Sequence, residues 1–254
     1  MTGFVPLLAK EFLEIRRTWR IWVVPGILLV FAVSGPIIAL ITPRLLSSIA
    51  TQQPGVVIRL PVPTAMDAYA QFLKGLSQIV LIALIIGGAG SVSGERASGT
   101  AIMVLSKPVS RASFLLAKLA AELALLICAT LIATGLTLAV TRAIFPPIAV
   151  TPLLSAVALW LVQGALVVSV MTFFSVAFRA RGAAAGAGLC FVLLLLLLSI
   201  WPAADRYTFV GLSAAMGMAL RGASPVVAIP IVTAFGAMAA FTVAAVLVFE
   251  GKEI

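Results

Sequence analysis

The sequence predicts an all-α membrane protein with six transmembrane helices, and two observations support this fold class. Of the 254 residues, 63% are hydrophobic and only 10% are charged, whereas a soluble domain carries about 25% charged residues. Six predominantly apolar windows reach the roughly 20 residues that a helix needs to cross a hydrocarbon core about 30 Å thick. A water-soluble globular protein is excluded, because too few polar side chains remain to cover its surface.

The expected spans belong to a single transmembrane domain covering residues 1–254. They lie at about residues 21–42, 72–92, 115–141, 153–177, 183–201 and 226–249. Between the first two spans, residues 43–71 are rich in proline and predict an irregular outer segment. Residues 202–225 contain an apolar piece that is too short to cross the membrane, which predicts a re-entrant or surface-lying helix between the last two spans.

Residues 1–20 are expected to form a separate amphipathic helix in the membrane interface. From residue 4 onward, apolar side chains recur at spacings of one, three and four, which places them on one side of a helix. This apolar set is Phe4, Leu7, Leu8, Phe12, Ile15 and Trp19. Glu11 interrupts the pattern, because it falls inside the apolar arc. The alternative is a basic flank, including Arg16 and Arg17, that only holds the N-terminus inside.

The net charge of +9 is explained by membrane topology. With six spans and both termini inside, 11 of the 17 basic residues fall in cytoplasmic segments, as the positive-inside rule requires. The cytoplasmic set is Lys10, Arg16, Arg17, Arg20, Arg96, Lys107, Arg111, Lys118, Arg179, Arg181 and Lys252. Both termini are therefore expected in the cytoplasm, and no nucleic-acid partner is expected.

The sequence contains no recognisable catalytic or metal-binding constellation. It has no histidine, and its eight carboxylates are scattered, which leaves no imidazole base and no paired acids for general acid–base chemistry. Cys128 and Cys190 lie in apolar runs, where a thiol packs as a small hydrophobe, so neither a disulfide nor a zinc site is expected. The chain is predicted to be no enzyme and to bind no metal or cofactor.

The segment 93–111, between the second and third spans, combines charges with a short apolar helix. Gly94 and Gly99 are expected to interrupt the second span, and Ser110 is a suitable cap for the third. A short helix between them would present an apolar side to the cytosol, which fits a groove of a partner protein. The residues of this candidate docking segment are Glu95, Arg96, Ser98, Gly99, Thr100, Ile102, Leu105, Lys107, Pro108 and Arg111. The alternative is an ordinary polar loop.

This segment resembles the corresponding loop of the ABC type-2 permease family. That family has E-x-x-x-G-T, L-L-x-x-P-V-x-R and G-K motifs here, and the matching residues are Glu95, Gly99, Thr100, Leu105, Pro108, Val109, Arg111 and Lys118. Ala101 and Ala117 depart from the pattern, because the family often has Leu and Gly at these positions. The compact six-span form is most similar to the branch that includes the nitrous oxide reductase maturation permease.

The resemblance implies a coupling helix that docks on a separate ABC ATPase subunit, in the cell membrane of a prokaryote. ATP and Mg would be bound by that partner, because the Gly-Lys pair at residues 251–252 lacks the other residues of a phosphate-binding loop. The exposed cations expected to contact the ATPase or membrane lipid are Arg16, Arg17, Arg179 and Arg181. A second copy of the chain is also expected, because six spans alone are few to enclose a pathway.

Two further features lie within the predicted spans. Gly182 and Gly186 form a small-xxx-small surface that favours contact with the second copy, although packing within one bundle fits the same spacing. Glu122 is the one carboxylate inside a predicted span, and Lys118 lies one helical turn before it. This spacing favours a structural Lys118–Glu122 pair, and the alternative is a substrate or proton role for Glu122.

The predicted function is the permease subunit of an ATP-binding cassette transporter. Export is the favoured direction, because the outer segments are too short to form a substrate-binding domain. The alternatives are a nucleotide-independent carrier or channel, and the membrane subunit of an ATP-driven assembly or maturation machine. Spans rich in Ala, Leu, Val and Phe suit an apolar substrate and lipid contact equally, so the sequence does not identify the substrate.

Overall fold

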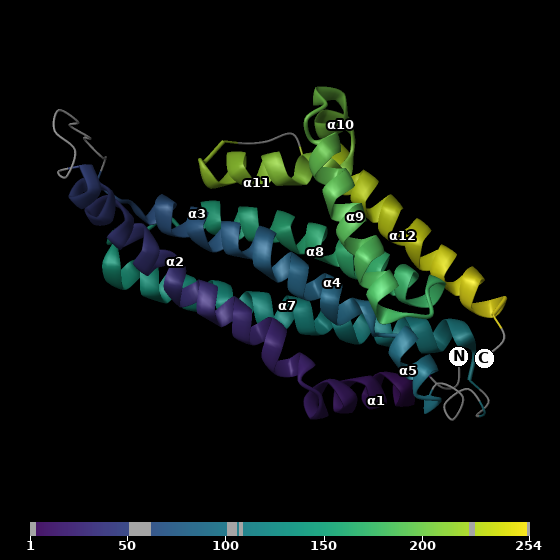
Figure 1. The fold of residues 1–254 in the computed structure, drawn as a ribbon. Helices are drawn as coiled ribbons and strands as arrows, with labels where there is room; N and C mark the ends of the chain where they lie inside the picture. The colour runs from purple at the N-terminus through teal and green to yellow at the C-terminus, as the bar shows by residue number, and fades with distance from the viewer. Residues whose placement is uncertain (1–3, 51–61, 101–105, 107–108, 224–226, 253–254) are drawn as a thin grey trace.

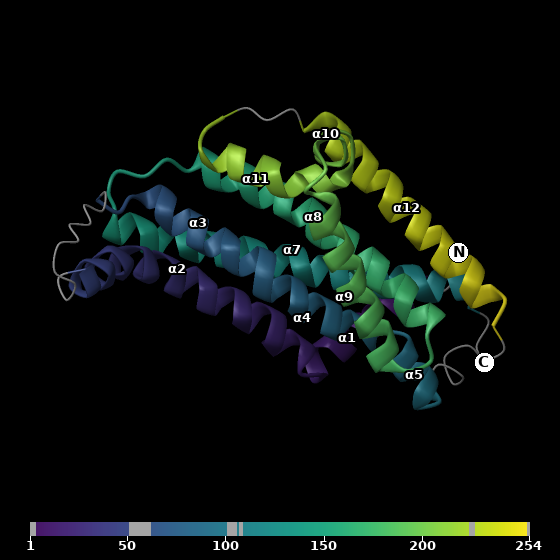
Figure 2. The ribbon, with the colours of Figure 1, turned by 45° about the horizontal axis from the view of Figure 1, so that its top comes forward.

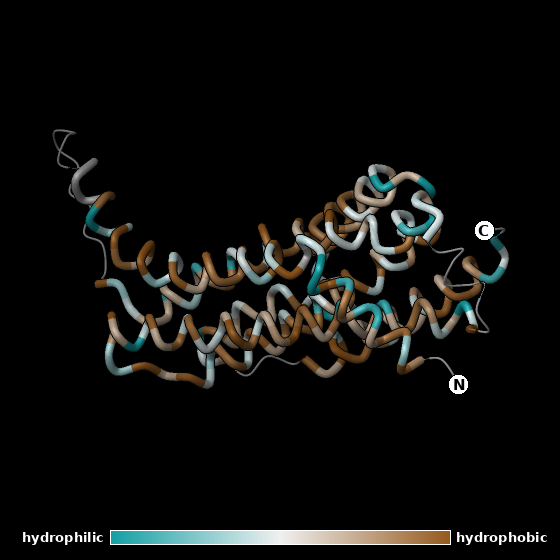
Figure 3. The backbone as a smooth tube through the Cα atoms, turned by 90° about the horizontal axis from the view of Figure 1, so that it is seen from below, coloured by the Kyte–Doolittle hydropathy of each residue, from teal (hydrophilic) through white to brown (hydrophobic). Residues whose placement is uncertain are grey.

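The structure is a computed structural model of the chain, and it describes residues 4–50, 62–100, 106, 109–223 and 227–252. The regular elements of this described part are helices (Figure 1). Six of them are long and apolar enough to cross a membrane, and hydrophobic residues predominate along them (Figure 3). The all-helical fold class with six spanning helices is therefore confirmed.

The described chain begins with α1 (Phe4–Arg17), and a short break separates it from α2 (Arg20–Ala50). The helix expected before the first span is thus present. Three prolines lie inside α2, at Pro25, Pro36 and Pro43. The prediction of an irregular segment from residue 43 was wrong at its beginning, because the long apolar helix tolerates these prolines and continues to Ala50.

The second span is assembled from several helical pieces. They are α3 (Ala65–Gly75), the π-helical turn η1 (Leu76–Val80), α4 (Leu81–Ala89) and α5 (Ser93–Ala97). The helix starts at residue 65 rather than near residue 72, because the Asp67 carboxylate accepts the backbone N–H of Thr64 at 2.8 Å and caps the first turn. The predicted irregular segment was therefore also wrong at its end.

Four long helices complete the set of spans. They are α7 (Arg111–Ile144), α8 (Thr151–Ala177), α9 (Arg181–Leu198) and α12 (Ala228–Glu250). Between α9 and α12 lie α10 (Pro202–Tyr207), the 3₁₀ turn η2 (Phe209–Gly211) and α11 (Leu212–Leu220). α11 packs on α8 (Figure 2) and buries Leu212 and Ala215, so the short helix expected in this part of the chain is present.

The spans pack into a bundle around α7 and α8. α2 packs on α3 and α7, whereas α8 packs on α4, α9, α11 and α12. Gly35 brings α2 close to α3, because a Cβ at this position would lie only 3.1 Å from the backbone nitrogen of Phe72. A residue without a side chain is what allows two helices to approach at this distance.

One end of the bundle brings together the segments that the sequence singled out, and we call it the basal end. It consists of α1, α5, the first turns of α7 and α9, and the last turns of α8 and α12 (Figure 1). A small apolar core closes the basal end, separate from the main core of the bundle. Its buried residues are Leu7, Val92, Phe114, Leu115, Ala117, Val176, Ala245 and Phe249.

Candidate functional site

The chain turns sharply between α4 and α5, and α8 stabilises this turn. The backbone N–H groups of Val92 and Ser93 donate to Ser175 Oγ at 2.9 and 3.0 Å. The buried Ser175 hydroxyl in turn donates to the carbonyl of Ala89 at 3.0 Å. Backbone groups released by the break are therefore satisfied inside the protein. The predicted break at Gly94 was wrong, because Gly94 lies within α5.

The Ser-Gly-Thr run of the sequence motif ends α5. Gly99 has a φ of +74°, a left-handed conformation that favours glycine after a helix. The Ser98 and Thr100 hydroxyls both donate to the carbonyl of Glu95, at 3.2 and 3.3 Å. These residues therefore shape the end of α5, where Ser98 and Thr100 are exposed.

A network of ion pairs joins α1, α5 and α7 at the basal end. The Lys118 ammonium on α7 donates to Glu11 Oε2 on α1 and to Glu95 Oε1 on α5, both at 2.7 Å. Lys10 on α1 donates to Glu11 Oε1 at 3.0 Å and to Glu95 Oε1 at 3.2 Å. Lys10 also pairs with Glu14 at 2.7 Å. Three segments that are far apart in the sequence thus meet at two ammonium groups.

The inner part of this network is almost inaccessible to solvent. The exposed fraction is 1% for Lys118, 3% for Glu11 and 8% for Glu95. The Phe114 ring covers the cluster, with the Lys118 Nζ atom 5.6 Å from its centroid. Buried charges of this kind persist only when they are paired, because an unpaired ion in an apolar environment is costly. The network therefore fixes the positions of α1 and α5 relative to α7.

Lys10 forms the outer, half-buried part of the network. Desolvation lowers its pKa, but the hydrogen bond to Glu14 and the charges of Glu95 and Glu11 outweigh this effect and raise the pKa above 10.5. The carboxylate oxygens of Glu11, Glu14 and Glu95 lie within 4.8 Å of one another, a spacing that would also suit a metal ion. The ammonium groups of the two lysines already contact these oxygens, so the arrangement is an ion-pair network.

Two cations bind the carbonyl groups at the end of α8. Arg96 on α5 donates to the carbonyl of Val176 at 3.3 Å. The Lys252 ammonium, just after α12, donates to the carbonyls of Val176 and Ala177 at 2.8 and 2.6 Å. Burial and the neighbouring charges of Arg96 and Arg179 lower the pKa of Lys252. A cation at this end of a helix compensates the partial negative charge of its free carbonyls.

Arg111, at the start of α7, binds the end of α12 in the same way. Its Nη1 atom contacts the carbonyl oxygens of Phe249, Glu250 and Lys252, at 2.8, 3.0 and 2.7 Å. The guanidinium carbon lies 5.8 Å from the centroid of the Phe249 ring, and this ring stacks on Phe114. Ser110 caps α7 as predicted, because its side chain accepts the N–H of Ser113. The candidate docking segment is therefore anchored at both ends.

The structure places the charged candidate docking residues in contact with neighbouring helices. Glu95, Arg96 and Arg111 flank the candidate docking helix, and all three bind other parts of the chain. They support the segment from inside because their charges satisfy buried or terminal groups. Four predicted residues lie outside the described part of the chain, namely Ile102, Leu105, Lys107 and Pro108.

The other predicted contact residues are mostly exposed. Arg16, Arg17 and Arg179 are exposed at the basal end. The Arg181 side chain lies over Gly90 and Gly94, near the break between α4 and α5. At both glycines, the atoms nearest to a built Cβ belong to Arg181. Arg181 therefore helps to place α9 beside α5.

The small residues at the start of α9 divide between two sides of the helix. Gly182 and Gly186 are exposed, and a Cβ at either would have open space around it. Ala184 and Gly188 are buried, and a Cβ at Gly188 would collide with Met171 of α8. Packing within the bundle therefore uses the second pair, which leaves the predicted Gly182–Gly186 surface uncovered in a single chain.

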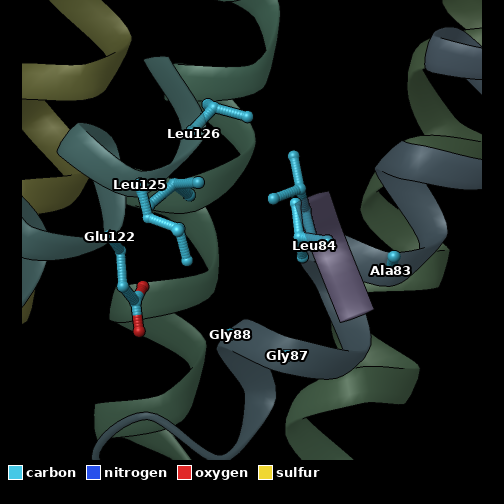
Figure 4. A pocket seen from close by; sticks show the side chains of 9 residues that line it. Ala83, Leu84, Gly87, Gly88, Glu122, Leu125 and Leu126 are labelled. Atoms are coloured by element: carbon cyan, nitrogen blue, oxygen red, sulfur yellow. The ribbon is translucent and has the colours of Figure 1, made fainter. Parts of the chain in front are cut away.

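The sequence suggested a Lys118–Glu122 pair, and the structure adds two partners from other helices, because Lys118 pairs with Glu11 and Glu95. Glu122 lies one turn further along α7 and lines a cavity of about 50 Å³ (Figure 4). The rest of the lining is apolar and comes from α2, α4, α7 and α8: Val24, Ala83, Leu84, Gly87, Gly88, Leu125, Leu126 and Val168. Spacing on one helix suggested the pair, but two carboxylates from other helices reach Lys118.

Sequence reasoning missed three residues of the basal end. Glu11 had a signal, because it is a charge inside the apolar arc of α1, and the structure places it in the network. Ser175 had none, since a serine in an apolar helix commonly bonds to its own backbone. Lys252 was read only as a topology signal, whereas it binds the end of α8.

The all-helical bundle with six long apolar helices and a charged basal end belongs to the class of multi-pass membrane proteins. Residues 5–229 match the description "ABC-2 family transporter protein". Because this match spans most of the chain, the protein belongs to the ABC-2 transporter family. Members of this family are generally non-catalytic permease subunits that work with an ATP-binding subunit.

A curated relative is similar over most of its length. It is the uncharacterized transmembrane protein YxlG of Bacillus subtilis (strain 168), which is 22% identical over 189 residues. The similarity covers 74% of this chain and 73% of the relative. This relative's description does not extend beyond a transmembrane protein, so the functional argument rests on the family and on the basal end.

Proposed function

We propose that the chain is the permease subunit of an ABC transporter and that separate subunits bind ATP and Mg and dock at the basal end. The observation that carries the proposal is the anchoring of α5 in a member of the ABC-2 family. α5 is tied to α1 and α7 by buried ion pairs, and to α8 by Arg96. A partner that displaces α5 would therefore act on three other helices at once.

The proposed contact surface is the exposed end of α5, at residues 97–100, which we call the tip. Ala97, Ser98 and Thr100 are exposed, whereas Glu95 behind them is buried. This arrangement supports a division of roles, in which the tip touches the ATP-binding subunit and the charges behind it transmit force. At the opposite end of the bundle, only residues 145–150 connect α7 to α8, which is too short for a substrate-binding domain and favours export.

The docking proposal is tested by placing a large cation at the tip. We expect Ala97→Arg to weaken co-purification with the ATP-binding subunit encoded nearest to this chain, because the new side chain would fill the contact. Ala203→Arg is the matched control, since Ala203 is also exposed but lies in α10, far from the basal end. Equal recovery of the complex with both variants would contradict docking at this tip.

The basal end is proposed to face the cytoplasm, with Arg16, Arg17 and Arg179 near anionic lipid headgroups or the ATP-binding subunit. The excess of basic residues at this end supports this orientation. Ala180 lies in the exposed turn between α8 and α9. A cysteine introduced there should react with a membrane-impermeant thiol reagent in inside-out vesicles, and labelling only in right-side-out vesicles would reverse the orientation.

A second copy is proposed to pack against the exposed face of α9. Gly182 and Gly186 leave room for another helix, and Cys190 follows on the same face one turn later and is also exposed. Small residues at this spacing allow close helix contact in a membrane. Oxidation of the Cys128→Ser variant should therefore yield a cross-linked dimer. If no Cys190 cross-link forms while the protein is dimeric by mass, the contact lies elsewhere.

A further inference from the structure

We propose that Lys118 is the positioning residue that makes α1 and α5 move together, so that a displacement of α5 reaches the first span through α1. The inference rests on the proposed function, because it gives a path to the motion that an ATP-binding subunit would impose. Lys118 would touch neither nucleotide nor substrate. Its role would be to hold two separate helices against one ammonium group.

A carboxylate from α1 and a carboxylate from α5 bind the same ammonium group. The Lys118 Nζ atom lies 2.7 Å from a carboxylate oxygen of Glu11 and 2.7 Å from one of Glu95. Lys10 bridges the same two carboxylates from the outer side. With Glu14, which pairs with Lys10, three carboxylates share two ammonium groups, and Lys118 is the almost fully buried one of the two. Moving α5 without α1 would separate opposite charges.

Burial makes such a separation costly. Lys118 and Glu11 are both at least 97% buried, and apolar side chains such as Phe114 and Leu7 surround them. Water cannot replace a lost partner in this environment, and an uncompensated buried charge strongly disfavours the separated state. The two helices are therefore expected to keep their contact when α5 is displaced.

The connection from α1 to α2 is short enough to carry the motion further. The backbone N–H of Thr18 still donates to the carbonyl of Glu14, at 3.0 Å. The N–H groups of Trp22 and Val23 donate to the carbonyl of Trp19, at 3.0 and 3.1 Å. Little free chain lies between the two helices, so α1 acts as a lever on α2, and α2 packs on α3 and α7.

The test measures the position of α1 in the assembled complex. Spin labels are attached to Ala9→Cys on α1 and to Ala180→Cys in the turn between α8 and α9, two exposed positions. The native thiols are removed by Cys128→Ser and Cys190→Ser, and excess unlabelled chain suppresses distances between copies. Distances are recorded by pulsed electron paramagnetic resonance in nanodiscs, with and without ATP and Mg. We expect the label distance to shift when nucleotide binds.

A variant without the buried charges distinguishes a loss of helix coupling from a loss of folding. In the variant Glu11→Met, Glu95→Met and Lys118→Met, apolar side chains of similar length replace the charges, which in other proteins is neutral or stabilising. Methionine side chains are flexible and their contacts have no fixed direction, so α1, α5 and α7 could slide past one another. We expect this variant to lose the nucleotide-dependent shift, and its complex formation and ATP hydrolysis are measured alongside. The control Lys10→Met/Glu14→Gln, which changes only the outer part, should keep it.

The outcomes separate the two proposals. If the unmodified chain forms the complex and supports ATP hydrolysis but α1 does not shift, the role of Lys118 is refuted and the proposed function stands. A full shift in the neutral variant also refutes that role. If no complex forms with an ATP-binding subunit, the proposed function itself fails. Should the neutral variant not fold, the measurement on the unmodified chain still decides whether α1 moves with the nucleotide.

Discussion

The segment between the second and third spans is attached to its neighbours in two different ways. Toward α1 and α7, the attachment consists of buried carboxylate–ammonium pairs at Glu11, Glu95 and Lys118. Toward α8 and α12, it consists of Arg96 and Arg111 on backbone carbonyls. The first attachment loses a charge partner when one side chain is removed, whereas the second leaves only neutral carbonyls at helix ends. The two attachments should therefore differ in how much they contribute to stability.

The largest effect is expected from Lys118→Met, which leaves Glu11 and Glu95 buried with too little positive charge. Breaking a buried pair in this way costs about 3–5 kcal/mol, so the thermal unfolding midpoint in detergent should fall sharply. Lys74→Met is the matched control, because Lys74 is exposed on α3. Equal midpoints for the two variants would show that the buried network contributes no more than a surface charge.

A smaller effect is expected from Arg111→Gln, which weakens the attachment to α12. The carbonyls of Phe249 and Glu250 would lose a charged donor, but they lie at a helix end where water can replace it. A cation at a helix C-terminus contributes up to about 2 kcal/mol, so the free energy of unfolding should fall by less than in Lys118→Met. Arg179→Gln, at an exposed position, serves as control in the same thermal measurement. If the free energy of unfolding fell as much as in Lys118→Met, the two attachments would contribute equally to stability.

Gly99→Ala probes the tip that lies between the two attachments. Its φ of +74° is unfavourable for alanine by about 1–2 kcal/mol, so this variant should lower the free energy of unfolding. Gly236→Ala is the control, because Gly236 lies in α12 with open space around it, and alanine there should be neutral or stabilising. Unfolding curves of the two variants that shift in the same direction would argue against the left-handed turn.

The spans were predictable from the sequence because length and hydropathy alone determine what can cross a membrane. The ends of the spans were not. α2 continues past Pro43, because a long apolar helix tolerates proline, and α3 starts early because Asp67 caps its first turn. The start of α3 depends on a local hydrogen bond and the extension of α2 on how the helix accommodates proline, so neither boundary follows from a hydropathy window.

The basal end was only partly predictable. The motif residues Glu95, Gly99 and Lys118 were recognised, and Glu11 was noticed as a charge in an apolar arc. The sequence did not show that these charges meet. Glu122, one turn after Lys118 on the same helix, fits the spacing of a helical ion pair and was the partner that the sequence suggested. Only the packing of α1 against α7 brings Glu11 to Lys118. Pairing between distant helices is a three-dimensional property that periodicity along one helix does not contain.

The smallest effect is expected from Lys10→Met, which removes the outer part of the ion network. The Lys10 side chain is 37% exposed, and exposed pairs contribute about 0–1 kcal/mol, so its loss should cost far less than that of Lys118.

The pKa of Lys10 is raised in the folded state, which determines how its contribution to stability depends on pH. Its contribution is fully present below the unfolded value of 10.5 and is lost only as the pH rises through the higher folded value. The difference in unfolding midpoint between Lys10→Met and the unmodified chain should therefore be equal at about pH 7 and about pH 9. A difference that disappears between these two values would place the ammonium outside the network and leave Lys118 as its only cation.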